Sequence, residues 1–164
     1  MMTSLSQALP QDWKKEMVIL SDRADIDRRA GTVIYEGDVL LTQGTLKIQA
    51  QRLTIYRNAE GLEKVVAEGT PATYQQQIEV DKPITNAKGD RIDYFTLERR
   101  ITLRGDAELE QAGNVFSGNL ITYDMTDETV KAVGTNSVSD QTERAPDGRI
   151  KVIIQPQSAP GNQK

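Results

Sequence analysis

Two pairs of acidic residues have a spacing that suits acid–base chemistry. Asp25 and Asp27 stand two positions apart, as do Glu108 and Glu110, which places both carboxylates of a pair on one face of a β-strand. Glycoside hydrolases use two carboxylates in this way. Strand exteriors of β-proteins also carry charge for solubility alone, so we predict that neither pair is catalytic and that the protein is not an enzyme. A carbohydrate hydrolase built on repeated strands is the enzymatic alternative.

Other catalytic chemistry is limited by what the 164 residues lack. There is no histidine and no cysteine, which excludes a Ser-His-Asp triad, a thiol nucleophile, a disulfide and a zinc site with nitrogen or sulfur ligands. No Gly-x-x-x-x-Gly-Lys-Ser/Thr loop is present for binding a nucleotide. We therefore expect neither a cofactor nor a metal.

Charge and hydropathy exclude two further classes. Twenty basic and 24 acidic residues give a net charge of −4 and a pI near 5.0, without the basic excess that binding to nucleic acid requires. The longest apolar run is residues 17–20 and the mean hydropathy is −0.52. A membrane-spanning helix needs about 20 apolar residues. We expect a small soluble domain.

The elements that position these residues are strands. Valine, isoleucine and threonine are frequent, and apolar residues alternate with polar ones in residues 47–49, 50–56 and 149–154, as in strands with one buried face. Turn residues separate such runs at 58–61, 112–114 and 145–148. The pattern predicts an all-β protein, with one short helical turn near residues 11–17.

A strand-pair signature recurs four times along the chain. Alternating pairs occur at Ile26/Arg28, Leu53/Ile55, Ile92/Tyr94 and Ile121/Tyr123, three of them preceded by Ala50, Gly89 or Gly118. A second strand with a central glycine follows each, at Gly37, Gly69, Gly105 and Gly134. One such unit cannot bury its apolar face alone, so the units must pair in succession. We predict an elongated antiparallel β-structure whose strands bend at these glycines.

Residues 33–50 closely resemble the OstA-like family of lipopolysaccharide-transport proteins, and residues 69–74, 105–111 and 118–123 resemble its later repeats. The resemblance covers about residues 17–155. It implies a twisted antiparallel β-jellyroll, open at both ends, that carries lipopolysaccharide from the inner to the outer membrane.

The resemblance implies that alternate apolar residues form a hydrophobic groove that shields the acyl chains of lipid A. The alternative for any one position is an ordinary packed core, and for the whole protein a β-scaffold that binds proteins without lipid. The predicted lipid-binding residues are Met17, Ile19, Val39, Leu41, Leu46, Ile48, Tyr74, Tyr94, Leu103 and Phe116.

Arginines could add polar contacts to such a cargo. Arg28, Arg29, Arg99 and Arg100 stand in pairs at expected turns, and Arg104 precedes a glycine. They are either solvated turn residues or contacts to sugar phosphates, and the sequence leaves both open.

The terminal strands, residues 16–20 and 149–154, are apolar and lack proline, so they leave unpaired edges that invite pairing with other strands. The residues expected to contact partners there are Met17, Ile19, Ile150, Val152 and Ile154. We expect head-to-tail self-association. The resemblance implies an LptC-like protein at the N-terminal edge and an LptD-like periplasmic domain at the C-terminal edge.

The domain boundaries are predicted from the first and last apolar strands. We expect a flexible lead-in over residues 1–15, a jellyroll domain over 16–155 and a disordered tail over 156–164. The first residues show neither a basic nor an apolar segment of a signal peptide, so a periplasmic protein would have lost its signal from this sequence. The periplasmic domain of an LptD-like assembly protein is the alternative within the family.

Overall fold

The computed structural model describes residues 12–59, 61–78, 80–134 and 149–156. Over these residues the chain forms a 3₁₀ helix, η1 (Asp12–Lys14), and one ten-stranded antiparallel sheet, which confirms the predicted all-β fold. The strands are β1 (Val18–Leu20), β2 (Arg23–Asp27), β3 (Thr32–Gln43), β4 (Leu46–Asn58), β5 (Gly61–Gln76), β6 (Thr85–Phe95), β7 (Arg100–Gln111), β8 (Asn114–Asp124), β9 (Thr129–Val133) and β10 (Lys151–Ile153). No helix in the described ranges is long and apolar enough to cross a membrane.

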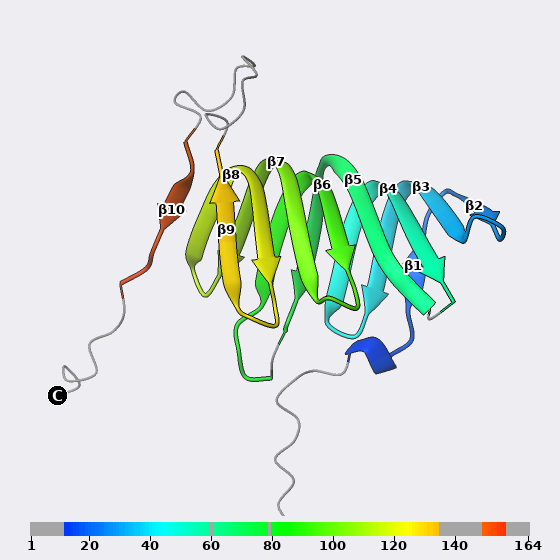
Figure 1. Ribbon diagram of the computed structural model, residues 1–164, viewed down its shortest axis with the longest axis horizontal. Helices are drawn as coiled ribbons and strands as arrows, with labels where there is room; N and C mark the ends of the chain where they lie inside the picture. Colours follow the sequence, from blue (N-terminus) through cyan, green and yellow to red (C-terminus); the bar gives the residue numbers. More distant parts are fainter. Residues whose placement is uncertain (1–11, 60, 79, 135–148, 157–164) are drawn as a thin grey trace, which may run out of the picture.

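Each end of the sheet is formed by two short strands that pair with one long strand, and we call each such pair of short strands a double edge. Strands β3 to β8 pair in chain order. Strands β1 and β2 pair with the second and first halves of β3, and β10 and β9 pair with the first and second halves of β8. Figure 1 shows an elongated, twisted jellyroll with one double edge at each end, so the sheet is open at both ends as predicted.

Each long strand bends near its middle, and the bends fold the sheet into two layers. Gly37 and Asp38 in β3, like Gly105 and Asp106 in β7, have positive φ angles and lie where the pairing register shifts. A glycine adopts this conformation at little cost, and the bulge that results turns the strand. The register of β5 shifts across Gly69. These three predicted bends are confirmed.

The fourth predicted bend, at Gly134, is wrong. Strand β9 ends at Val133 and pairs only with the second half of β8, so it belongs to one layer and needs no bend. The first copy of the repeat also differs from expectation, because Ile26 lies on the edge strand β2 and its side chain is 62% exposed.

The small residues of the repeat lie opposite the bends. Ala50, Gly89 and Gly118 face bend-adjacent residues of the neighbouring strands. A Cβ atom on Gly89 would come within 3.2 Å of the Arg104 carbonyl oxygen. Only a small residue therefore fits where two bent backbones approach each other.

The core lies between the two layers. In both layers, the alternate apolar residues that were predicted to point inward are buried. The most deeply buried side chains include Leu41, Leu53, Ile92, Ile101, Leu103, Leu109 and Ile121. Figure 1 shows the hairpin turns between β3 and β8 along the edge opposite the bends, where the layers come apart. We call this the open edge.

The predicted boundaries fall partly outside the described residues, as do the whole turn at 145–148 and residues 1–11 and 157–164. Residues 12–15 of the expected lead-in are described, and Asp12 is buried there. The first strand begins at Val18 rather than at residue 16, so Met17 lies just before it.

Candidate binding cavity

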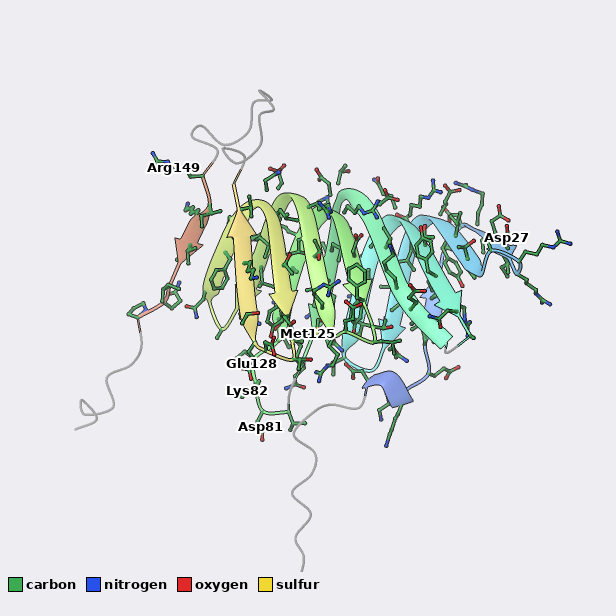
Figure 2. All side chains as sticks on the ribbon, viewed as in Figure 1. Asp27, Asp81, Lys82, Met125, Glu128 and Arg149 are labelled. Carbon is green, nitrogen blue, oxygen red and sulfur yellow. The ribbon has the colours of Figure 1, made fainter. Side chains whose placement is uncertain are left out.

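A cavity of about 1030 Å³ lies between the two layers in the N-terminal half of the jellyroll. Its volume is at the upper end of the roughly 300–1,000 Å³ that is usual for small-molecule sites. Its lining comes from η1, from β1 and the residue before it, and from strands β3 to β6. The turns after β5, β6 and β8 also contribute, the last through Met125 (Figure 2), whereas strands β7 and β8 themselves contribute none. Leu97 and Arg57 line it and are exposed, so the cavity reaches solvent at the open edge.

Six of the ten predicted lipid-binding residues line this cavity. They are Met17, Ile19, Leu41, Leu46, Ile48 and Tyr94. Leu41, Leu46 and Ile48 are buried and form its wall in one layer, while Tyr94 is half-buried and belongs to the other.

The other four predicted residues lie elsewhere. Val39, Tyr74 and Leu103 are packed in the core with at most 1% of the residue exposed. Phe116 is half-buried on β8, opposite Val152 of the edge strand β10. The structure therefore gathers six of the predicted residues at one cavity, leaves three in the packed core and places Phe116 beside an edge strand.

Tyr94, which lines the cavity, packs against Tyr74 in the core. Tyr74 from one layer meets Tyr94 from the other, with ring centroids 5.9 Å apart and planes at 77°. The Tyr74 hydroxyl donates a hydrogen bond to Gln76 Oε1. Burial raises the pKa of Tyr74 well above its ordinary value of 10.0, and burial likewise raises the pKa of Tyr94. Both rings are therefore neutral at physiological pH.

Helix η1 is fixed to the open edge by one carboxylate. Asp12 Oδ1 accepts a hydrogen bond from the Thr45 backbone nitrogen at 2.9 Å, and Asp12 Oδ2 accepts from Thr45 Oγ1 at 2.6 Å and Gln76 Nε2 at 2.9 Å. The neighbouring Gly44 has a φ of +61°, and a Cβ there would lie 2.2 Å from Asp12 Oδ1. Asp12 itself lines the cavity, so η1 forms part of its mouth.

Sequence reasoning missed eight apolar lining residues. They are Val33, Tyr35, Ile55, Leu62, Val65, Ile78, Leu97 and Met125. For Val33, Tyr35, Ile55 and Val65 the available signal was the alternation that predicts the strands, since the layer opposite the predicted lining has to be apolar as well. Leu97 and Met125 lie in turns, where no alternation marks them.

The arginines separate into two groups. Arg99 lines the cavity together with Arg57, which the sequence analysis did not single out. Arg28 and Arg29 lie in the exposed β2–β3 turn, and Arg104 lies exposed at a bend.

Arg100 is held on the outer face of the sheet. Its guanidinium pairs with Glu98 and lies 4.4 Å from the centre of the Phe95 ring. It therefore has partners of its own and does not line the cavity.

One acidic pair has polar partners on the neighbouring strand, and the other is exposed. Glu108 lies 3.5 Å from Lys88 Nζ, and Glu110 accepts a hydrogen bond from Asn86 Nδ2 at 2.9 Å. Asp25 and Asp27 are exposed on the edge strand β2. Across the described ranges no group of three or more acidic residues is arranged to hold a metal ion.

The amino-acid sequence is similar to those of known proteins. The family described as "LptA/(LptD N-terminal domain) LPS transport protein" matches residues 18–129. The lipopolysaccharide export system protein LptH of Pseudomonas aeruginosa is 36% identical over 94% of this chain and 87% of its own length. LptA of Haemophilus influenzae is 34% identical over 80% of this chain and 78% of its own.

A solved structure agrees with the sequence comparison. The crystal structure of Pseudomonas aeruginosa LptH, described as the LptA-homologous periplasmic component of the lipopolysaccharide transport device, matches with a TM-score of 0.79 and 34% identity. The match covers 90% of this chain and all of that one. With its bent-strand jellyroll and interior cavity, the chain belongs to the LptA/LptD N-terminal domain family of lipopolysaccharide-transport proteins.

Proposed function

We propose that this chain is a periplasmic carrier that binds lipopolysaccharide and shields its acyl chains in the cavity on the way from the inner to the outer membrane. The observation that carries the proposal is an apolar space of about 1030 Å³ that reaches solvent, in a chain of this family. Each methylene buried there contributes about 0.8 kcal/mol, so acyl chains bind without catalysis or a cofactor. The relatives named LptH and LptA match over most of their own length, which favours a carrier over a domain of an LptD-like protein.

A test of lipopolysaccharide binding in the cavity compares substitutions at one leucine and one isoleucine whose side chains are about equally exposed. Leu97 lines the cavity and is 64% exposed, whereas Ile26 lies on β2 outside it and is 62% exposed. Leu97→Asp places a charge against the acyl chains and is expected to weaken lipopolysaccharide binding about tenfold or more, because an unpaired charge is costly in an apolar site. Ile19→Asp, deeper in the cavity, is expected to weaken binding further.

Affinity is measured by displacement of a fluorescent lipopolysaccharide, with circular dichroism as the check on folding. Ile26→Asp is expected to bind like the unaltered protein. Unchanged affinity in folded Leu97→Asp and Ile19→Asp would show that the cavity is not the binding site.

The second part of the proposal concerns protein partners at the two double edges. Exposed apolar side chains gather on the terminal strands, with Leu20 59% and Val152 44% exposed, and Ile154, directly after β10, is 63% exposed. Backbone groups on the outer side of an edge strand can pair with another sheet. We propose an LptC-like protein at the β1/β2 edge, an LptD-like periplasmic domain at the β9/β10 edge, and head-to-tail pairing between copies of the chain.

A further inference from the structure

Two arginines stand at the mouth of a cavity whose lining is mostly apolar. Arg57 is the last but one residue of β4, and Arg99 ends the turn between β6 and β7. Both line the cavity, and within the described ranges no other cationic side chain does so. They come from the same layer, at strand ends that face the open edge.

Neither guanidinium has a partner in the part of the chain that the structure describes. The ion pairs found there involve Arg23, Arg52, Lys88, Arg91 and Arg100. Asp12, the acidic residue of the cavity lining, is already engaged by Thr45 and Gln76. Among the described residues, the lining therefore holds two guanidinium groups without an ion pair, and its one carboxylate, Asp12, offsets at most one of their two charges.

The backbone holds both arginines in place while their side chains stay available. The Arg57 nitrogen donates to the Gly31 carbonyl at 2.8 Å, and the Arg99 carbonyl accepts from the Met125 nitrogen at 2.9 Å. Burial raises the pKa of Tyr94, and the charge of Arg99 partly opposes this, so the guanidinium acts on the cavity interior. Arg99 directly precedes β7, and strands β5 and β6 separate β4 from β7, so the two arginines stand at strand ends about 14 Å apart.

We propose that Arg57 and Arg99 bind the phosphate groups of the acylated cargo and hold its headgroup at the open edge while the acyl chains fill the cavity. A guanidinium matches phosphate with two parallel hydrogen bonds, which are strong because both partners are charged. Side chains of this length, at strand ends about 14 Å apart, can reach two phosphates on one headgroup. The inference rests on the proposed function and adds the headgroup chemistry that the site selects.

The test uses two lipids that differ only in phosphate. Binding of diphosphoryl lipid A and of the same lipid with both phosphates removed is compared for the unaltered protein and for Arg57→Gln/Arg99→Gln. The double variant is expected to lose about tenfold or more in affinity for the phosphorylated lipid and to bind the dephosphorylated lipid unchanged. Arg104→Gln/Lys131→Gln removes the same charge away from the cavity and is expected to keep the preference for phosphate.

A second measurement needs no substitution. The Nε–H resonances of Arg57 and Arg99 in the unaltered protein are expected to shift with phosphorylated lipid and to stay in place with dephosphorylated lipid. Inorganic phosphate alone is tested at the same concentration as the lipid. If it shifts the same arginine resonances, the two arginines form a general phosphate site. If it does not, they form a site for phosphate that is carried by a lipid.

Two results overturn the assignment. One is a double variant that keeps the full preference for phosphorylated lipid, and the other is arginine resonances that fail to respond to that lipid. Binding of neither lipid by the unaltered protein contradicts the proposed function itself. Binding of both lipids without any preference leaves the carrier function intact and removes only the arginine site.

Discussion

Tyr74 and Tyr94 show how single residues act at the boundary between the cavity and the packed core. Each comes from a different layer, and their edge-to-face contact at 5.9 Å joins the layers across the interior. Aromatic pairs in this geometry contribute about 0.5–1.5 kcal/mol beyond the area that they bury. The pair therefore stabilises the fold where the wall of the cavity meets the packed core.

The same pair makes the protein sensitive to alkaline pH. Burial raises the pKa of both side chains above 10.0, so above pH 10 the unfolded chain loses these protons first. The unfolded state then binds fewer protons than the folded state, and stability falls with rising pH by about 1.4 kcal/mol per pH unit for each tyrosine. We expect little contribution from the pair below pH 9 and a steep loss from pH 10 until the folded-state pKa values are reached.

Urea midpoints measured between pH 8 and 11 check this expectation. Tyr74→Phe keeps the ring and removes the titrating hydroxyl, so the variant is expected to show a shallower decline, although it also loses the hydrogen bond to Gln76. Equal slopes for the variant and the unaltered protein would mean that Tyr74 does not retain its proton in the folded state.

At the scale of the strands, the bends matter more than the strands' own propensities. Gly105 combines a φ of +80° with close packing, since a Cβ there would lie 2.5 Å from Asp90 Oδ2 and 2.9 Å from Asp90 Cβ. Gly105→Ala is therefore expected to destabilise the fold by about 1–3 kcal/mol. The loss is expected to appear as a lower midpoint in urea.

A matched variant separates the two causes. Gly61 also has a positive φ, +116°, but a Cβ there would meet nothing within 4 Å. Gly61→Ala reports the backbone term alone, and we expect it to cost less than Gly105→Ala. A larger loss at Gly61 than at Gly105 would contradict the view that packing at the bend requires the glycine.

The strands and three of the four bends could be predicted because alternation and glycine spacing are local signals. The extent of the cavity could not be predicted. Leu41 and Leu109 each follow the central glycine of their repeat by four residues, and only the packing between the layers makes Leu41 line a cavity and Leu109 fill a closed core. Arg57 was missed for a similar reason. A single arginine near a strand end looks like an ordinary solvated residue until the fold places it beside Arg99.

At the scale of the whole molecule, the jellyroll is asymmetric. The N-terminal half holds the cavity, and the C-terminal half is filled by side chains such as Leu109, Ile121 and Tyr123. Both halves have the same kind of apolar interior between two layers that share no strand hydrogen bonds at the open edge. Acyl chains longer than the cavity would have to separate the layers beyond the Tyr74–Tyr94 contact.

The two double edges give the molecule a direction, because the β1/β2 edge and the β9/β10 edge are different surfaces. A contact between unlike edges does not close, so it builds open chains of copies. We expect light scattering to show a mass that rises with concentration without a fixed stoichiometry. Lysine on an edge strand opposes such pairing, so Val18→Lys/Leu20→Lys is expected to stay monomeric.

A copy with a blocked β1 edge still has an intact β10 edge, and this makes the mixture informative. Added in small amounts to the unaltered protein, Val18→Lys/Leu20→Lys is expected to end growing assemblies and lower their mean mass. Val80→Lys/Ile84→Lys is the control, because both side chains are 44% exposed but lie between β5 and β6, away from either edge. Assemblies that ignore the blocked copy, or that shrink equally with the control, would show that copies do not join through β1, since only an edge contact lets one altered surface stop growth.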